Sequence, residues 1–571
     1  MASGYFTFVL HSHLPYVLGH GRWPHGVDWL NEATAETYIP LLRVCENLVG
    51  RGISPKLTLD ISPVLCEQLV HPSFKSEFAD YLRNRIVSAG HDAEEFGRTG
   101  RVDLLRLARR WEEFYSGLLR DFSDNYGSDI IARFRSLQDG GHIEIITCAA
   151  THGYLPLLSR DETCQAQIKQ AVASYRRFFG RAPRGIWLPE CAYRPSYEWS
   201  PPVSGENITG SYRRKGIEEF LSENLIEYFF IDSATLKGGK AIGVYVDRFE
   251  ALKTLWGKFE QQYKPRSEEQ EKTPLSVYLV GGGDGRRPVG VFTRHPETSL
   301  QVWSGEWGYP GDGNYLDFHK KRYPGGHRYW KVTSAKTDLA DKQIYNPDPI
   351  PGRLEENASH FTDLVGRNLG GYFKQSGIPG IVVAPFDSEL FGHWWFEGPA
   401  FLEKVLTKLA SSPDIDLCTA GEFFDLSKPS RIINLPEGSW GEGGYHYIWL
   451  NEWTDWTWRH IYEDEMIMRQ LAARYKKDDD LSRRIVKQAA RELMLLSASD
   501  WQFLISTWAA RDYAETRVVA HHEAFRRLAG MAEDPGNLSD SDLNYLSELE
   551  QKDNLFPDID PAWFEKIEFP S

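Results

Sequence analysis

Short apolar runs alternate with longer segments of helical spacing along most of this chain. The short runs are rich in β-branched and aromatic residues, whereas the longer segments repeat apolar residues every three or four positions. This alternation predicts an α/β fold with a parallel sheet, and counting strands leaves open whether the sheet closes into a barrel. Strands are predicted over 5–10, 56–59, 143–147, 185–188, 226–231 and 381–384, and helices over 32–49, 74–88, 104–121 and 164–179.

Two stretches interrupt this alternation, and a third region replaces it. Residues 193–212 are rich in Pro, Ser and Gly, and residues 260–271 are highly charged and precede a hairpin-like segment at 277–292. Long helical patterns dominate the last part of the chain, for example over 481–496 and 511–528. The predicted domains are a main α/β domain over 1–193 and 290–409, an inserted subdomain over 194–289, and an all-helical C-terminal domain over 410–571.

Polar, titratable residues directly follow several of the predicted strands. His11 and His13 lie in HSHLP, His152 in ATHGY, Glu190 in WLPECAY, and Asp387 in APFDSELFGHWW. In barrels and open parallel sheets, the functional groups gather at the carboxyl ends of the strands. These residues are therefore expected to meet in one site.

The two carboxylates in this set have rigid and apolar neighbours. Glu190 follows Trp-Leu-Pro, and Asp387 follows Ala-Pro-Phe. Such surroundings favour a raised pKa for one member of a carboxylate pair, and a pair of this kind is what glycoside cleavage needs. The plainer interpretation is that each carboxylate caps a helix or lies at the surface after its strand.

The histidines allow two interpretations. His11 and His13 alternate along a strand, so both imidazoles point to one face. With His152 and Asp387 they would make a plausible zinc-binding set. Alternatively, they are neutral imidazoles that hydrogen-bond a polar ligand, because an HxH pair alone is a weak metal signal.

The composition narrows the range of partners. The chain has 571 residues and a formal net charge of −15, from 65 Lys and Arg against 80 Asp and Glu, which argues against nucleic acid. Its six Cys include no CxxC pair, which fits a reducing cytoplasm. No run approaches the ~18 apolar residues of a membrane span, so no membrane partner is predicted. Nineteen Trp, many in loop-like contexts, suit stacking against sugar rings as well as an aromatic core.

Taken together, the motifs HSHLPYV, ATHGY, WLPECAY, PFDSELFGHWW and SDWQF resemble glycoside hydrolase family 57, and within it most closely the 1,4-α-glucan branching enzymes. The resemblance covers about residues 5–565. It implies an α/β fold built on an incomplete (β/α)7 barrel with an inserted subdomain and a helical C-terminal domain. It also implies a retaining mechanism with no metal and no other cofactor.

The resemblance also implies roles for individual residues. Glu190 would be the nucleophile and Asp387 the general acid/base, with carboxylates about 5–5.5 Å apart. Tyr245 would lie on a mobile loop that keeps water from the intermediate. The substrate-binding positions implied by the resemblance are His11, His13, His152, Tyr245, Arg294, Trp303, Gly311, His393, Trp440 and Asp500.

The predicted activity is cleavage of α-1,4 links in an α-glucan and transfer of the chain to a 6-hydroxyl, as in glycogen synthesis. One alternative keeps the site but changes the outcome, giving an α-amylase or a 4-α-glucanotransferase. Another is a metal-dependent polysaccharide deacetylase or zinc mannosidase that uses His11, His13 and Asp387. A third is a glucan-binding protein without catalysis. A chelator would inactivate the metal-dependent enzyme but not the favoured one, and a glucan-binding protein without catalysis would tolerate Glu190→Gln.

Overall fold

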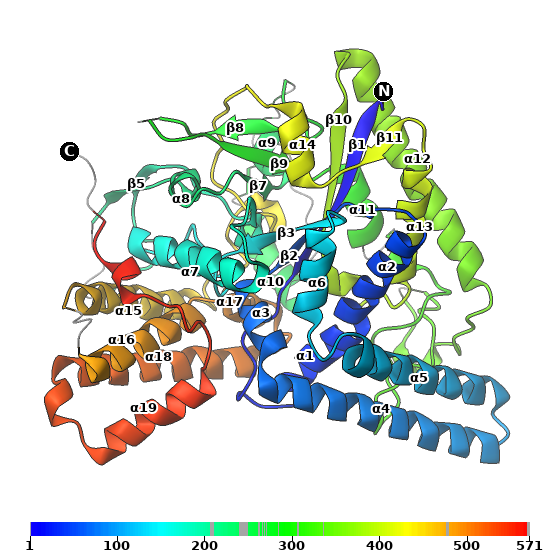
Figure 1. The fold of residues 1–571 in the computed structure, drawn as a ribbon, viewed down its shortest axis with the longest axis horizontal. Coiled ribbons are helices and arrows are strands. Elements are labelled where there is room, and N and C mark those ends of the chain that lie inside the picture. Colours follow the sequence, from blue (N-terminus) through cyan, green and yellow to red (C-terminus); the bar gives the residue numbers. More distant parts are fainter. Residues whose placement is uncertain are drawn as a thin grey trace.

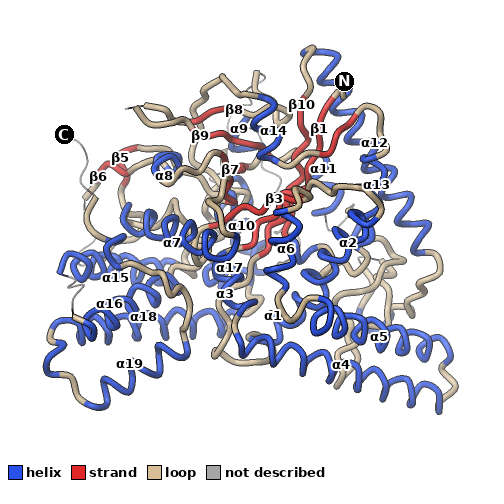
Figure 2. The backbone as a smooth tube through the Cα atoms, viewed as in Figure 1, coloured by secondary structure: helices blue, strands red, loops and turns tan. Residues whose placement is uncertain are grey.

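A parallel sheet runs through the middle of the molecule, with helices around it (Figures 1 and 2). The computed structural model describes residues 2–205, 210–238, 249–260, 263, 264, 267, 269, 271–283, 285–304, 308–334, 336–474 and 479–567. Within these ranges, seven parallel strands pair in the order β10-β1-β2-β3-β4-β7-β9. They are β1 (Gly4–Ser12), β2 (Leu57–Ile61), β3 (Ile143–Cys148), β4 (Gly185–Trp187), β7 (Tyr228–Ile231), β9 (Val289–Thr293) and β10 (Gly380–Asp387).

The outer parallel strands, β9 and β10, almost close the sheet. No ladder joins them in the described part of the chain, but the His295 N–H just after β9 donates a hydrogen bond to the Val383 carbonyl of β10 at 3.0 Å. The strands are buried along almost their whole length, as expected for a parallel sheet covered by helices. The predicted incomplete (β/α)7 barrel is confirmed.

Helices cover the outside of this barrel. In Figure 1, α4 and α5 form a long antiparallel pair that extends from it. The helices of this layer are α1 (Val27–Ala33), α2 (Ile39–Gly50), α3 (Pro63–Val70), α4 (Pro72–Arg98), α5 (Val102–Arg120), α6 (Ile130–Asp139), α7 (Asp161–Phe179), α11 (Pro296–Trp303), α12 (Ile350–Ser376), α13 (Gly398–Ala410) and α14 (Ala420–Ser427).

The single helix predicted over 32–49 is interrupted. A buried π-helical turn, Thr34–Tyr38, lies between α1 and α2. A π turn inserts an extra residue and shifts which side chains face inward, and such turns are frequent at functional sites. Here the turn directs Glu36 and Tyr38 to partners in the segment that follows β10.

The range predicted as an inserted subdomain is not separate from the barrel. It contains a hairpin of β5 (Tyr197–Trp199) and β6 (Tyr212–Arg214), then α8 (Ile217–Glu223), α9 (Ser233–Lys237) and α10 (Glu250–Phe259). It also contains the barrel strand β7, and β8 (Tyr278–Val280) forms the predicted hairpin with β9. The prediction of one insertion over 194–289 is therefore corrected, because the apolar run at 228–231 completes the sheet instead of leaving it.

The C-terminal region is helical, as predicted, but it begins later than residue 410. β11 (Ile415–Leu417) pairs with the start of β1, and the main-chain N–H of Ala420 in α14 donates to the Thr58 hydroxyl of β2. The helices that follow are α15 (Asp455–Arg474), α16 (Asp480–Leu496), α17 (Asp500–Thr507), α18 (Arg511–Glu533) and α19 (Asp540–Lys552). None of the described helices has the length and apolar character of a membrane span.

Candidate active site

Three neighbouring strands end in titratable residues that share one edge of the sheet. In the register of β1, His11 lies beside Asp387 of β10 on one side and beside Asp60 of β2 on the other. Parallel strands present their carboxyl ends at the same edge of a sheet, so these three side chains lie close together there. The sequence predicted a site at this edge from His11 and Asp387.

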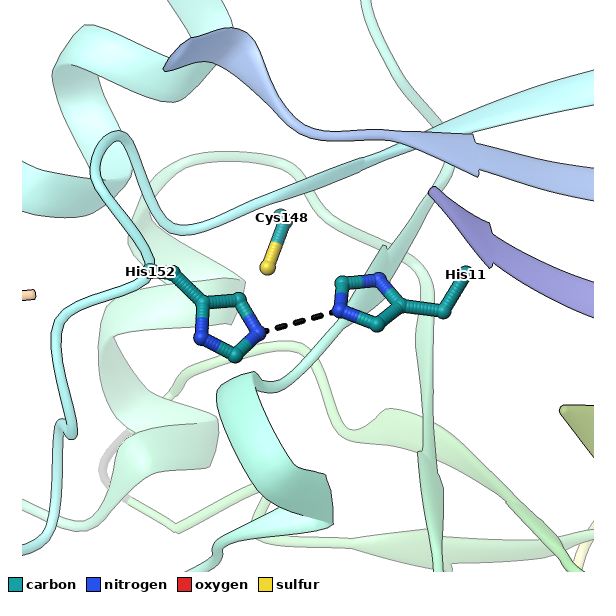
Figure 3. A group of neighbouring side chains, drawn as sticks. All are labelled: His11, Cys148 and His152. Atoms are coloured by element: carbon teal, nitrogen blue, oxygen red, sulfur yellow. Dashed lines mark hydrogen bonds between the residues drawn. The ribbon is translucent and has the colours of Figure 1, made fainter. Parts of the chain in front are cut away.

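His11 and His152 form the buried part of the site (Figure 3). His11 Nδ1 lies 2.5 Å from Asp60 Oδ2, and His11 Nε2 lies 3.0 Å from His152 Nε2. His152 Nδ1 in turn lies 2.7 Å from the Ser499 hydroxyl. Burial lowers the pKa of His11 to about 3 and holds that of His152 well below its usual value. Both imidazoles are therefore neutral hydrogen-bonding groups.

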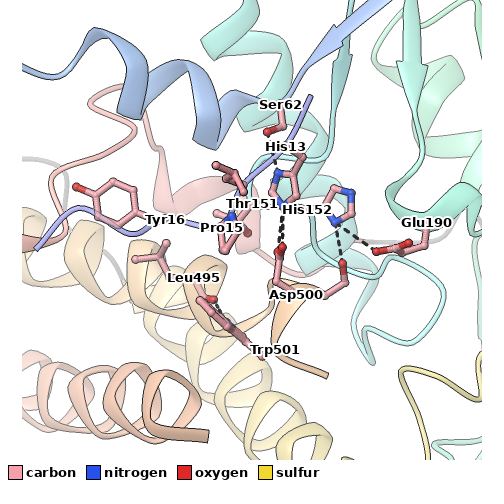
Figure 4. Close-up of polar contacts among 12 residues, drawn as sticks. His13, Pro15, Tyr16, Ser62, Thr151, His152, Glu190, Leu495, Asp500 and Trp501 are labelled. Carbon is pink, nitrogen blue, oxygen red and sulfur yellow. Dashed lines mark hydrogen bonds and ion pairs between the residues drawn. The ribbon is translucent and has the colours of Figure 1, made fainter. Parts of the chain in front are cut away.

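His13 joins the barrel to the C-terminal helices (Figure 4). Its Nδ1 lies 2.8 Å from the Ser62 hydroxyl, and its Nε2 lies 3.0 and 3.1 Å from the two carboxylate oxygens of Asp500, the first residue of α17. The His13 and His152 rings stack with centroids 4.0 Å apart. His11, His13 and His152, which we call the histidine cluster, are thus held from both halves of the chain.

Glu190 follows β4 in a left-handed backbone conformation, with φ 60° and ψ 24°. The Trp440 indole N–H donates to Glu190 Oε2 at 2.6 Å, and His152 Nδ1 lies 4.0 Å from Oε1. The carboxylate side chain remains 15% exposed. Burial raises the pKa of Glu190 to about 8, the Trp440 hydrogen bond opposes that rise, and the negative charge of Asp387 adds to it. The sequence predicted a raised pKa for one carboxyl of the Glu190–Asp387 pair, and Glu190 has it.

Aromatic rings border the Glu190 carboxylate. Trp440 makes edge contacts with Trp187 and Trp303, with ring centroids 5.1 and 6.0 Å apart. The Arg294 guanidinium carbon lies 5.8 Å from the Trp440 ring centroid, and this guanidinium pairs with Asp232 at 2.5 Å. The structure therefore groups the predicted residues Trp303 and Arg294 around Trp440, which contacts Glu190.

Two of the predicted residues, His393 and Gly311, have no contact with Glu190 or the histidine cluster among the described contacts, and a third, Tyr245, is not described. His393 Nδ1 lies 2.7 Å from Glu36, and its carbonyl accepts a hydrogen bond from Arg328, so buried partners outside the histidine cluster hold it. Gly311 ends a short 3-10 turn, and its main-chain N–H donates to the Gly308 carbonyl at 3.0 Å. Tyr245 lies outside the described residues, so its place stays a prediction.

Comparison with known proteins agrees with these strand-end motifs. Residues 7–436 match the model of glycosyl hydrolase family 57, and residues 460–564 match the model described as "1,4-alpha-glucan branching enzyme, C-terminal". The chain belongs to glycosyl hydrolase family 57. The family match contains Glu190 and Asp387, whereas the C-terminal match contains Asp500, so the site combines residues from both.

Relatives within family 57 cover nearly the whole chain. A 1,4-alpha-glucan branching enzyme of Thermococcus kodakarensis is 42% identical over 555 residues, which are 97% of this chain and 77% of the relative. The crystal structure of a GH57-type branching enzyme from Pyrococcus horikoshii has a TM-score of 0.87 at 39% identity, covering 100% of this chain and 98% of that chain. The alpha-amylase AmyC from Thermotoga maritima has a TM-score of 0.80 at 29% identity, covering 100% of both.

Several residues of this family 57 site were not predicted from the sequence. Asp60, Ser62 and Ser499 each hold one histidine of the cluster. Asp60 carries a visible signal, since it is a carboxylate at the end of an apolar strand, like the residues that the motif search selected. Tyr38, which donates to Glu389, has no such sequence signal, because it lies in a π-helical turn that interrupts the helical periodicity.

Two groups of side chains at the site have the atoms to hold a metal ion. The ligand atoms of His11, Cys148 and His152 lie within 4.8 Å of one another, as do those of His13, His152 and Asp500. Neither group combines His11, His13 and Asp387, the set of the metal-dependent alternative. In both groups the imidazole nitrogens already take part in the hydrogen bonds given above.

Glu389 provides a second carboxyl with a raised pKa beside Asp387. Burial raises its pKa to about 8; a hydrogen bond from the Tyr38 hydroxyl opposes the rise, and the charge of Asp387 adds to it. A pKa above the ordinary 4.5 means that the protonated acid stabilises the fold. This stabilisation is complete below 4.5 and is lost as the pH rises through about 8.

We therefore expect the stability of Glu389→Gln to decrease less than that of wild type as the pH becomes alkaline. Gln stays neutral at every pH and keeps an oxygen that can accept the hydrogen bond from the Tyr38 hydroxyl. In thermal melts, the melting temperature of the variant relative to wild type should rise by several degrees between about pH 6 and about pH 9. Glu437→Gln is the control, because His446 holds the pKa of Glu437 below its usual value against the effect of burial. A constant difference for Glu389→Gln across this pH range would contradict the prediction.

Proposed function

We propose that this family 57 chain is a 1,4-α-glucan branching enzyme. The observation that carries the proposal is Asp500, which lies in the region matching the branching-enzyme C-terminal model and holds His13 of the histidine cluster. The donor is an α-1,4-glucan, and the acceptor is a 6-hydroxyl of a second chain or segment. A glycogen-like polymer as product and a cytoplasmic location belong to the same proposal.

In the first step, one oxygen of Glu190 attacks the anomeric carbon of the donor. The bond from that carbon to the glycosidic oxygen breaks, and Asp387 gives its proton to the leaving oxygen. The reactive form therefore has Glu190 ionised and Asp387 protonated. The two carboxylates act on each other, and the Trp440 indole N–H favours the ionised form of Glu190.

In the second step, the acceptor 6-hydroxyl attacks the same carbon and displaces Glu190. Asp387 takes the hydroxyl proton, which returns both carboxyls to their starting forms. Attack from opposite faces in the two steps retains the α configuration. Water can replace the acceptor, so exclusion of water decides between branching and hydrolysis. Tyr245, which lies outside the described residues, is our candidate for that exclusion.

The histidine cluster is proposed to position the sugar next to Glu190. The neutral imidazoles of His11 and His152 donate and accept hydrogen bonds without attracting ions, which suits the hydroxyls of an uncharged sugar. Arg294, Trp303 and Trp440 form the other side of the same proposed subsite, and Gly311 and His393 are proposed as more distant substrate contacts. Precise placement of the donor lowers the barrier of both steps.

Proton NMR of amylose incubated with the protein tests this function. We expect α-1,6 anomeric signals to increase far more than new reducing ends, because transfer creates no net reducing end. A majority of reducing ends would instead identify a hydrolase. That second candidate rests on the similarity to the Thermotoga maritima alpha-amylase over the full length of both chains.

The same assay with a chelator separates glucan transfer from metal-dependent chemistry. The proposed mechanism uses two carboxylates, so activity should persist in EDTA. Loss of activity in EDTA with recovery on addition of Zn²⁺ would overturn the proposal. It would point to His13, His152 and Asp500 as metal ligands.

A further inference from the structure

Two tryptophans form an aromatic pair on the surface outside the candidate active site. Trp508 follows α17 and is 56% exposed, and Trp453 is partly buried beside it. Their ring centroids lie 5.3 Å apart with planes inclined by 37°. The Arg511 guanidinium carbon lies 6.0 Å from the Trp508 ring centroid. We call Trp453 and Trp508 the tryptophan pair.

The backbone at Trp508 makes its side chain unusual. Trp508 ends α17 with φ 56° and ψ 17°, the left-handed conformation in which helices commonly end on Gly. A bulky L side chain in this conformation carries a steric cost. Strain of this kind clusters at binding and catalytic positions, so the Trp508 indole is a candidate for a binding role.

Two elements connect the tryptophan pair with the catalytic centre. α17 begins at Asp500, which holds His13, and its eight residues span about 12 Å before Trp508. The other element begins at Trp440, which donates to Glu190, and reaches Trp453. Trp508 and Trp453 thus lie at the far ends of two segments whose near ends contact catalytic residues.

Buried hydrogen bonds fix these two elements to each other. The Asn451 amide donates to the Ser506 hydroxyl at 2.9 Å, and that hydroxyl donates to the Ile448 carbonyl at 2.6 Å. The Trp453 main-chain N–H donates to the Asn451 side chain at 2.9 Å. The tryptophan pair therefore has a fixed position relative to Glu190 and the histidine cluster.

We propose that the tryptophan pair binds an α-1,4-glucan chain at a distance from the catalytic centre. This inference rests on the proposed function and identifies a further subsite for its polymer. The C–H faces of pyranose rings stack on indoles, and an uncharged chain needs no cluster of charge to attract it. A long glucan would occupy both the catalytic subsite and the tryptophan pair, whereas a short oligosaccharide would occupy only the first.

Substitutions at the tryptophan pair test this subsite in the full-length protein. Trp508→Ala and Trp453→Ala should weaken retardation in native gels containing amylopectin and raise the KM for amylose by about three- to tenfold, the size of one stacking contact. The KM for a short maltooligosaccharide should stay unchanged. Tyr323→Ala, at an 89% exposed aromatic residue whose neighbour Arg322 pairs with Asp92 of α4, should leave both KM values unchanged.

Trp508→Gly separates binding from folding. Gly suits the left-handed backbone, so this variant should melt at or above the wild-type temperature while losing affinity for amylopectin as Trp508→Ala does. Unchanged retardation and amylose KM in the alanine variants, with an active wild type, would overturn the inference alone. A change of oligomeric state in these variants would overturn it in favour of a protein interface. A wild type that neither binds nor cleaves amylose would refute the proposed function itself.

Discussion

Glu190→Gln should abolish both branching and hydrolysis, with a loss of at least about a thousandfold, because no glycosyl-enzyme can form without the nucleophile. The substitution keeps the size of the side chain and an oxygen that accepts the Trp440 indole N–H. It also removes a carboxyl whose pKa of about 8 makes ionisation costly to the fold, so the variant should melt no lower than wild type at alkaline pH. New reducing ends and α-1,6 signals measure the loss, and a melt at the assay pH controls for folding.

Azide distinguishes a nucleophile from a carboxyl that acts in another way. In Glu190→Ala, azide can enter the space of the lost carboxylate and attack from its face, giving a β-glycosyl azide from an α-linked donor. The same anion added to Asp387→Ala should attack the glycosyl-enzyme from the opposite face and give the α-glycosyl azide. The reverse pairing of products would show that the two roles are exchanged.

Asp387→Asn should reduce turnover of amylose by about 10²–10⁴-fold, because the leaving oxygen is no longer protonated. With α-maltosyl fluoride the initial release of fluoride should be affected much less, since fluoride needs little help from an acid. The charge of Asp387 raises the pKa of Glu190, so its removal should also move the acidic limb of the kcat/KM profile to lower pH. Equal losses on both substrates would argue that Asp387 is not the general acid.

Most barrel strands could be predicted from the sequence because each is a short apolar run with polar ends. The strand predicted over 381–384 is the core of β10, and that over 143–147 is β3. Closure of the sheet could not be predicted, because it depends on a contact between His295 and Val383 that no local pattern contains. The predicted insertion over 194–289 was wrong for a similar reason. It contains β7, which is too short to be assigned to one domain by sequence.

The candidate site was predictable where chemistry coincides with a strand end. His11 and Asp387 lie in neighbouring strands, so the parallel register brings them together without further information. Asp500 and Trp440 required the family resemblance, because they reach the site from loops and helices hundreds of residues away. Tyr38 and Ser499 could not be predicted, because a single hydroxyl residue belongs to no sequence motif with a characteristic spacing.

The bond between His13 and Asp500 also affects how the protein matures. The two residues are separated by 487 positions, so a growing chain cannot complete the site until nearly the whole polypeptide has been made. At the usual pace of synthesis, about 5–20 residues per second, His13 waits roughly 25 to 100 s for its partner. If Asp500 has the role proposed for it, the emerging barrel is expected to stay inactive until α17 has been made and has docked.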